Sequence, residues 1–183
     1  DNMFEDVNKD GKLDAEDLVY LGTDDPKMQF SINAGVEWKG LDFSIVFQGA
    51  GKRTVWREKS TWRIPMRTTY QNGSNQFIGN TWTPENTGAY YPALTNKSEL
   101  NNYNYQCSSW SVEDGSYLRL KNLQVGYTFK FGEKSPVERT RIYFSGSNLF
   151  TLTKYRVFDP ENGLNTTSFP NSRVYSIGAN VTF

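Results

Sequence analysis

Six residues between positions 6 and 17 have the types and the spacing that a calcium-binding loop requires. Calcium prefers oxygen ligands, and a loop of about twelve residues supplies them at nearly every second position around a glycine turn. Here the loop begins at Asp6 and Gly11 occupies the turn. The expected metal ligands are Asp6, Asn8, Asp10, the backbone carbonyl of Lys12, Asp14 and Asp17.

The loop departs from the usual pattern at its last position, where Asp17 stands in place of a glutamate. Aspartate has a shorter side chain and reaches less far toward a metal. Loops that end in aspartate are similar to those of dockerin-like modules, so we predict an EF-hand/dockerin-like loop with calcium as the cofactor. The alternative is an acidic turn without a metal, because Asp, Asn and Gly also favour turns by themselves.

Composition argues against an enzyme and against a nucleic-acid partner. The chain has no histidine and one cysteine, Cys107, so the common acid–base, nucleophilic and zinc sites cannot be assembled. Twenty basic and twenty acidic residues cancel, so no net charge attracts nucleic acid. We predict no catalytic residues.

The chain combines a polar average with many large rings. Aromatic residues make up 15% of the sequence, although the mean hydropathy is −0.67. A soluble β-sandwich has this composition, and so does a transmembrane barrel, whose strands are apolar on one side and carry aromatic girdles. The sequence has no run of about 18 apolar residues, which excludes a membrane-spanning helix but not a barrel.

Alternation of apolar and polar residues predicts an all-β fold with about five antiparallel strands. A period of two is typical of strands with one apolar face. Within the third strand the apolar phase changes near Asn122, which predicts a β-bulge. The expected strands are residues 30–38, 41–48, 116–131, 139–150 and 175–183.

Two long loops interrupt these strands, at about 50–115 and at 155–172. Loops of this length are rare in compact domains but normal on the extracellular side of outer-membrane barrels. We therefore predict an extracellular loop with the calcium motif at 1–27 and a barrel segment at 28–183, with short helices or strand extensions near 54–63. Five strands cannot close a barrel, so the wall must be completed by other polypeptide.

The first long loop is rich in aromatic residues that suit a cargo-binding surface. Rings stack on sugars or grip peptide backbone, which makes them candidates for substrate contact. The alternative is that the rings pack the loops against each other or against a partner protein. The candidates are Trp56, Trp62, Trp82, Tyr90 and Tyr91.

Four segments, in this order along the chain, resemble the carboxyl-terminal part of SusC/RagA-type TonB-linked outer-membrane transporters of Bacteroidetes. The resemblance depends on their order, because each segment alone is common. They are Asp6-Val-Asn-Lys-Asp-Gly-Lys-Leu-Asp14; Ser116-Tyr-Leu-Arg-Leu-Lys-Asn-Leu123; Ser145-Gly-Ser-Asn-Leu-Phe-Thr151 with Asp159-Pro-Glu161; and Asn180-Val-Thr-Phe183.

The resemblance implies a multi-pass β-barrel of about 22 strands in the outer membrane, with a plug in its lumen. It also implies import of oligosaccharides or peptides, energy supplied through TonB, and a SusD-like surface lipoprotein as partner. The rest of the barrel, the plug and the membrane lipid would be further partners. Phe183 resembles the signal that the barrel-assembly machinery reads.

Two other functions remain open from the sequence. A secreted calcium-binding β-sandwich that acts as a carbohydrate-binding module would also explain the acidic loop and the alternating strands. A secreted glycoside hydrolase would need two carboxylates at a set separation. No pattern in the sequence pairs such carboxylates.

Overall fold

The sheet begins with a hairpin whose turn is two residues long. Strand β1 (Met28–Trp38) pairs antiparallel with β2 (Leu41–Gly51). Lys39 and Gly40 form the turn, with φ angles of 47° and 89°. Two successive positive φ angles are typical of a type I′ turn, whose twist matches that of the flanking strands. The structure is a computed structural model and describes residues 2–57, 73–156, 158–162 and 169–183.

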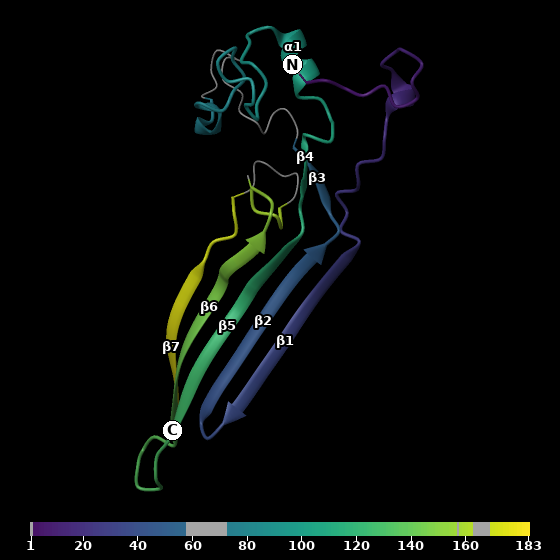
Figure 1. The fold of residues 1–183 in the computed structure, drawn as a ribbon. Coiled ribbons are helices and arrows are strands. Elements are labelled where there is room, and N and C mark those ends of the chain that lie inside the picture. The colour runs from purple at the N-terminus through teal and green to yellow at the C-terminus, as the bar shows by residue number, and fades with distance from the viewer. Residues whose placement is uncertain (1, 58–72, 157, 163–168) are drawn as a thin grey trace. The chain divides into compact units, whose positions relative to one another are not determined.

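Five strands form one antiparallel sheet in the order β1-β2-β5-β6-β7 (Figure 1). The remaining members are β5 (Tyr117–Lys130), β6 (Arg139–Thr153) and β7 (Val174–Thr182). Every neighbouring pair runs antiparallel. The prediction of five antiparallel strands in a β fold is confirmed.

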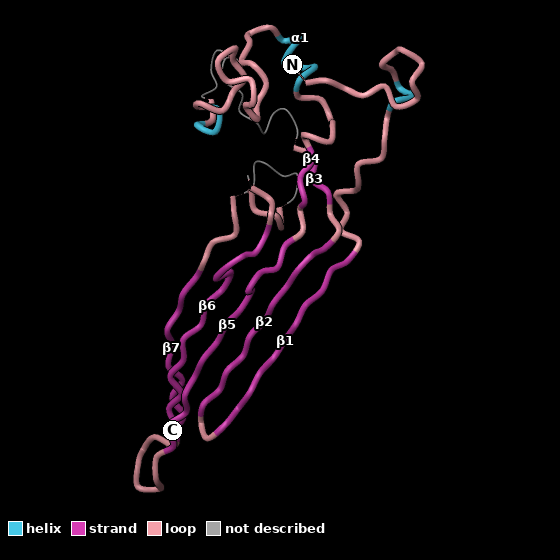
Figure 2. The backbone as a smooth tube through the Cα atoms, viewed as in Figure 1, coloured by secondary structure: helices cyan, strands magenta, loops and turns pink. Residues whose placement is uncertain are grey.

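The short turns of the sheet lie at one end and the long connections leave from the other (Figure 2). At the short-turn end, the amide of Phe131 donates to the carbonyl of Glu138 at 3.0 Å and closes the β5–β6 turn. At the opposite end, Tyr117 pairs with Thr153. The β2–β5 and β6–β7 connections both begin there, so the sheet has one loop end and one short-turn end.

A bulge interrupts the central strands where the apolar phase of the sequence changes. The register shifts between Leu120 and Asn122 of β5, opposite both β2 and β6. On β6 the interruption coincides with Asn148, whose φ angle is 54°. A bulge places one extra residue in a strand. Because the apolar phase of the sequence changes at the same point, the apolar side chains before and after the bulge lie on the same face. The bulge predicted near Asn122 is confirmed.

The two faces of the sheet differ in side-chain type. Cross-strand partners on one face are apolar, for example Ile45 opposite Leu123 and Phe144 opposite Ile177. The same face is exposed: Ile177 is 82% and Trp38 is 64% accessible. The other face carries polar and charged residues, among them Asp42, Ser44, Gln48, Arg119, Gln124, Arg141, Ser145 and Ser176. We call these the apolar face and the polar face.

The backbone contacts divide the chain into two units, residues 1–22 with 55–113 and residues 23–54 with 114–183. In its described residues the first unit contains α1 (Ser98–Asn104) and the 3₁₀-helices Ala15–Asp17 and Asn75–Phe77. A two-stranded sheet of β3 (Thr54–Trp56) and β4 (Val112–Asp114) lies at the division. Strand β3 is the extension expected near 54–63, whereas residues 58–63 lie outside the described part.

The helices of the described residues are short. The longest, α1, has seven residues. None of the helices in residues 2–57, 73–156, 158–162 and 169–183 is long and apolar enough to cross a membrane.

Candidate functional site

The predicted calcium loop folds around the side-chain oxygens of its own acidic residues. The amides of Lys9 and Gly11 donate to the two carboxylate oxygens of Asp6, at 2.6 and 2.8 Å. The amide of Lys12 donates to Oδ1 of Asp10 at 2.8 Å. Gly11 makes the sharp turn with a φ of 85°, a value that a side chain would disfavour.

The loop ends in the 3₁₀-helix Ala15–Asp17, which Asp14 caps. Oδ1 of Asp14 accepts from the amide of Glu16 at 2.9 Å. Asp17 accepts from the amides of Asp14 and Val7, at 2.9 and 2.8 Å. The bond from Asp14 is the main reason that the pKa of the Asp17 carboxyl is lowered. Ionised Asp17 therefore ties the start of the loop to its end.

The oxygen atoms of these side chains suit calcium in type and in sequence spacing. A carboxylate oxygen that accepts one hydrogen bond still has a lone pair for a cation. Within the described residues, however, no three His, Cys, Asp or Glu side chains lie close enough together to hold a metal. Calcium binding at this loop stays a prediction.

The aromatic residues predicted to contact cargo differ in exposure. Trp56, Trp82 and Tyr90 are 36%, 40% and 46% accessible, whereas Tyr91 is 7% accessible. The fifth candidate, Trp62, lies outside the described residues. The amide of Trp82 donates to the carbonyl of Tyr91 at 2.8 Å, so these two candidates come from adjoining segments.

Tyr91 belongs to an aromatic cluster with Phe77, Tyr105 and Trp110. Its ring lies 4.5 Å from that of Phe77, and the rings of Tyr105 and Trp110 are 5.7 Å apart. Burial raises the pKa of the Tyr105 phenol. Tyr90 stacks on Trp110 at 5.6 Å while almost half of it stays exposed. The cluster thus forms a small core in the first unit and supports the exposed ring of Tyr90.

An open pocket of about 390 Å³ lies beside this cluster. Phe77 contributes to both, while the rest of the lining comes from small, polar and aliphatic side chains. The lining residues are Gly73, Ser74, Asn75, Phe77, Ile78 and Leu94. The four candidates that the structure describes, Trp56, Trp82, Tyr90 and Tyr91, are not among them.

A network of charged residues in the described part of the second unit lies on the polar face, at the loop end. Arg119 is only 3% exposed. Its Nε donates to Thr151 at 2.8 Å, its Nη1 to Glu161 at 2.7 Å and its Nη2 to Asp159 at 2.5 Å. The guanidinium group thus binds two carboxylates at once, which its fixed fork of donors favours. Sequence reasoning did not single out this network.

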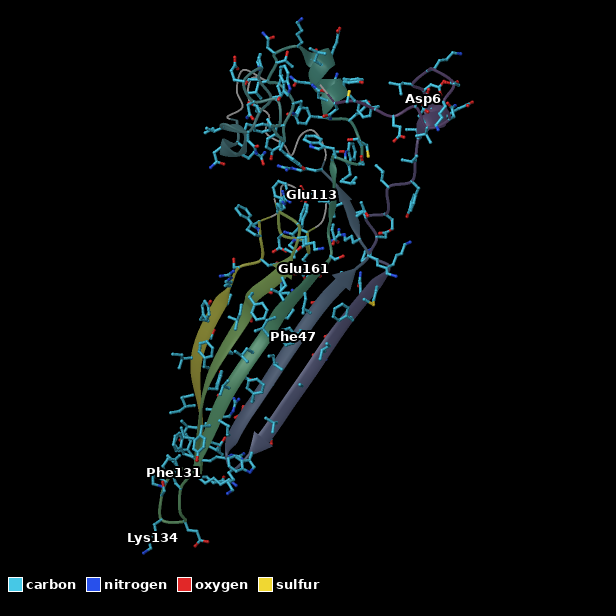
Figure 3. All side chains as sticks on the ribbon, viewed as in Figure 1. Asp6, Phe47, Glu113, Phe131, Lys134 and Glu161 are labelled. Atoms are coloured by element: carbon cyan, nitrogen blue, oxygen red, sulfur yellow. The ribbon has the colours of Figure 1, made fainter. Side chains whose placement is uncertain are left out.

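Further contacts hold the segment Asp159–Glu161, which contains both of these carboxylates. Lys121 donates to both carboxylate oxygens of Glu161, at 2.7 and 3.0 Å. Arg53 donates to the carbonyl of Pro160 at 2.7 Å and pairs with Asp24 at 2.9 Å. In Figure 3 Glu161 lies at the loop end of the sheet, far from Phe131 at the short-turn end.

Opposing effects act on the pKa of Asp159. Burial raises it, but the hydrogen bond from Arg119 and the amides of Glu161 and Asn171 outweigh burial, so the pKa lies below its usual range. Asp159 is therefore ionised at neutral pH and complements the charge of Arg119. The network neutralises its charges internally.

A second ion pair lies on the polar face nearer the short-turn end. Arg141 forms a two-pronged contact with Asp42, and its Nε lies 2.8 Å from a carboxylate oxygen. Its guanidinium also stacks on Tyr143, 4.7 Å from the ring centroid. Gly126 provides the space: a Cβ there would lie 2.5 Å from Asp42. Arg141 of β6 and Asp42 of β2 thus form an ion pair across the sheet.

An open sheet of long strands, apolar and exposed on one face and polar on the other, is typical of a segment of a transmembrane β-barrel wall. No family profile matches the sequence. The chain is 32% identical over 200 aligned residues to TonB-dependent receptor P26 of Formosa agariphila; the alignment covers 98% of this chain and 19% of the receptor. It is 24% identical to TonB-dependent receptor SusC of Bacteroides thetaiotaomicron, across 100% of this chain and 18% of that protein.

Solved structures agree with this class. The RagAB peptide importer in its open-open state superposes with a TM-score of 0.68 and 27% identity, over 87% of this chain and 17% of that chain. The chain belongs to the SusC/RagA type of TonB-dependent receptors, which are outer-membrane β-barrel proteins. It spans about a fifth of the length of these relatives. The relatives are receptors and a transporter, not enzymes.

Proposed function

We propose that this chain forms five membrane-spanning strands of an outer-membrane nutrient importer. The observation that carries the proposal is the exposed apolar face. A soluble domain buries such a face, whereas a barrel wall turns it toward lipid. The exposed apolar side chains of this face include Ile32, Val36, Trp38, Tyr127, Ile142, Phe144, Tyr175, Ile177 and Val181.

The short-turn end carries the rings that would anchor the wall at the membrane interface. Aromatic girdles and nearby cations are typical of barrel rims. Trp38 lies 4.9 Å from the ammonium group of Lys39, a contact that places a ring and a charge together at the turn. Phe183, proposed as the assembly signal, is 85% exposed. The exposed rings at this end include Trp38, Phe129, Phe131 and Phe183.

The polar face would look into the barrel interior, toward the plug. Its paired charges, Arg119 with Asp159 and Arg141 with Asp42, suit a wet but crowded lumen. In this proposal the remaining strands and the plug come from the rest of the receptor. TonB would supply energy through that part, and a SusD-like lipoprotein would cover the loop end.

The cargo we propose is an oligosaccharide or a peptide. Support comes from the exposed rings of Trp56, Trp82 and Tyr90 in the first unit, because exposed rings stack on sugars and on peptide groups. Tyr91 would act by supporting Tyr90, whose ring lies 5.0 Å away. Substitution of Tyr90 with alanine in the whole receptor should weaken cargo uptake more than substitution of Tyr91 with phenylalanine.

Lipid contact can be tested with neighbouring positions on the two faces. In a full-length receptor carrying Cys107→Ser, Ile177→Cys and Ser176→Cys would each be spin-labelled in bilayers. We expect a lipid-soluble relaxation agent to broaden the label at 177 and a water-soluble agent to act more strongly at 176. Equal access of the water-soluble agent to both positions would contradict the proposal.

A secreted β-sandwich module is the alternative reading. It requires a second sheet packed on the apolar face. Among the described residues that face is exposed, so this structure favours the barrel wall. Fractionation distinguishes the two, because a barrel remains with detergent-solubilised outer membrane and a sandwich is released by high salt.

We also propose that the Asp6–Asp17 loop binds calcium and that the ion stiffens an extracellular loop. Support comes from the oxygen ligands at alternate residues and from Gly11 at the turn. Extracellular loops of this kind bind calcium with a dissociation constant on the order of 10⁻⁴ to 10⁻³ M. Calcium titration of the whole receptor should lose one site in Asp10→Ala and none in the neighbouring control Glu5→Ala. Identical titrations of parent and Asp10→Ala would remove the calcium proposal.

A further inference from the structure

The β6–β7 connection does not extend freely from the sheet but turns back onto its polar face. Arg119 identifies the face, because it pairs with Gln48 of β2 and with Thr151 of β6, both polar-face positions. The carboxylates that Arg119 binds, Asp159 and Glu161, belong to the connection. Since Arg119 is 3% exposed, the connection covers the polar face at this point.

The returning arm of the connection is fixed to the same network. The amide of Asn171 donates to Oδ2 of Asp159 at 2.9 Å, and its side-chain nitrogen donates to Glu161 at 2.5 Å. Asn148 of β6 donates to the carbonyl of Ser172 at 3.1 Å. Both the outgoing and the returning arm are therefore held close to the sheet.

The charges of the network are matched, which indicates positioning and not ligand binding. Two cations, Arg119 and Lys121, meet two carboxylates, Asp159 and Glu161. The carboxylate of Asp159 accepts from Arg119 and from two backbone amides. A buried charge with several donors is held in one geometry, because releasing any partner leaves an unpaired charge.

We propose that Arg119 is a positioning residue that holds residues 158–162 and 169–172 folded inward, as a fixed constriction at the loop end of the barrel interior. The inference rests on the proposed function, since the polar face is the inner face only if the sheet is a barrel wall. A segment fixed over the inner face narrows the passage that cargo must take. Such a constriction also limits the size of a reagent that can reach these residues from outside the cell.

Size-selective labelling on whole cells tests this. A full-length receptor carrying Cys107→Ser and Phe169→Cys would be treated with a small sulfonated maleimide and with a polyethylene-glycol maleimide too large to enter a barrel. Phe169 is 93% exposed and is the first described residue of the returning arm of the constriction. We expect the large reagent to react severalfold more slowly than the small one. The reference ratio comes from a receptor that keeps the exposed Cys107, and in both receptors any cysteine outside this chain is replaced by serine.

In Arg119→Met, the ratio of the labelling rates of the large and the small reagent at position 169 should approach the ratio measured at Cys107. Arg139→Met is the matched control, because Arg139 is exposed and its Nε contacts only Thr182, at 3.3 Å. If Arg119→Met fails to assemble, the isosteric double variant Asp159→Asn, Glu161→Gln takes its place. Heat-modifiable migration verifies that each barrel is folded.

Two results would overturn the inference. One is equal labelling by both reagents in the parent, and the other is unchanged size discrimination in every variant of Arg119, Asp159 and Glu161 that folds. In either case the receptor would still be found in the outer membrane. Failure of the proposed function is distinguishable, because the receptor would then be absent from that membrane.

Discussion

The first unit has a buried aromatic cluster, whereas the sheet of the second unit has an exposed apolar face. In the first unit, Phe77 and Tyr105 are 3% and 2% exposed and pack against other rings. In the sheet of the second unit, Ile177 is 82% exposed while Arg119 on the opposite face is 3% exposed. Apolar side chains thus form a buried cluster in the first unit, whereas they are exposed on one face of the sheet.

This difference reflects the solvent that each unit is built for. Burial of apolar surface contributes about 25 cal/mol per Å² in water, which explains the small aromatic core of the first unit. Among the described residues of the sheet, the buried apolar side chains are few, for example Ala50 and Leu120. Neighbouring strands are joined by backbone hydrogen bonds, and the polar face carries the ion pairs of Arg119 and Arg141, as suits a wall between lipid and a wet interior. The same chain therefore combines a unit that folds as in water with a sheet suited to a membrane.

The largest expected effect tests the aromatic core. Phe77→Ala removes a buried ring and should cost about 3–5 kcal/mol of local stability, because a cavity remains. The neighbouring control is Ile78→Ala, since Ile78 is 82% exposed. Hydrogen exchange of the first unit in the whole receptor measures both. Similar exchange rates in the two variants would mean that the cluster does not stabilise this unit.

A charge on the apolar face should have the next largest effect. Ile177→Lys places an ammonium group at the middle of β7 and should cost about 2–4 kcal/mol if that position faces the centre of the bilayer. Ser176→Lys, on the polar face, is the matched control and should assemble normally. Outer-membrane abundance and heat-modifiable migration are the measurements. Normal assembly of both variants would contradict the assigned facing.

The sheet was predictable from the sequence because its signals are local. Alternation of side chains fixes the strands, and the two-residue turn at Lys39 and Gly40 fixes the first hairpin. Even the bulge was visible, because an extra residue reverses the apolar phase near Asn122. Such features depend on neighbours within a few residues.

The charged network could not be predicted in the same way. In the sequence, 40 and 42 positions separate Arg119 from its partners Asp159 and Glu161. Their two segments were recognised separately by resemblance, but no local pattern says which cation meets which carboxylate. The same limit applies to Tyr91, whose burial depends on Phe77 and Tyr105 from other segments.

A smaller effect is expected where the polar face is tightly packed. Gly126→Ala would place a Cβ 2.5 Å from Asp42 and 2.8 Å from Arg141, so the ion pair must move. Overpacking of this kind costs about 1–3 kcal/mol. Gly132→Ala is the control, because a Cβ there has no heavy atom within 4 Å. Thermal unfolding of the detergent-solubilised receptor should distinguish the two, and equal midpoints would show that the pair is loosely held.

The smallest effect concerns the pH dependence of the charged network. The pKa of Asp159 is lowered in the folded chain, because Arg119 and two amides outweigh the effect of burial. Its stabilisation is therefore fully present above the unfolded pKa of about 3.9 and is lost as the pH falls through the lower, folded value. Asp159→Asn should lower stability at neutral pH by about 1 kcal/mol, the difference between a charge-assisted and a neutral hydrogen bond, and should reduce the acid slope.

Unfolding midpoints measured from neutral pH to about pH 2 test this dependence. Asp25→Asn is the control, since Asp25 is exposed and lies outside the network, and it should retain the acid slope of the parent. A slope that is the same in Asp159→Asn would mean that acid destabilises the receptor through other carboxylates. The stability of the sheet would then not depend on the Arg119–Asp159 ion pair. The two units would still differ in the burial of their apolar side chains.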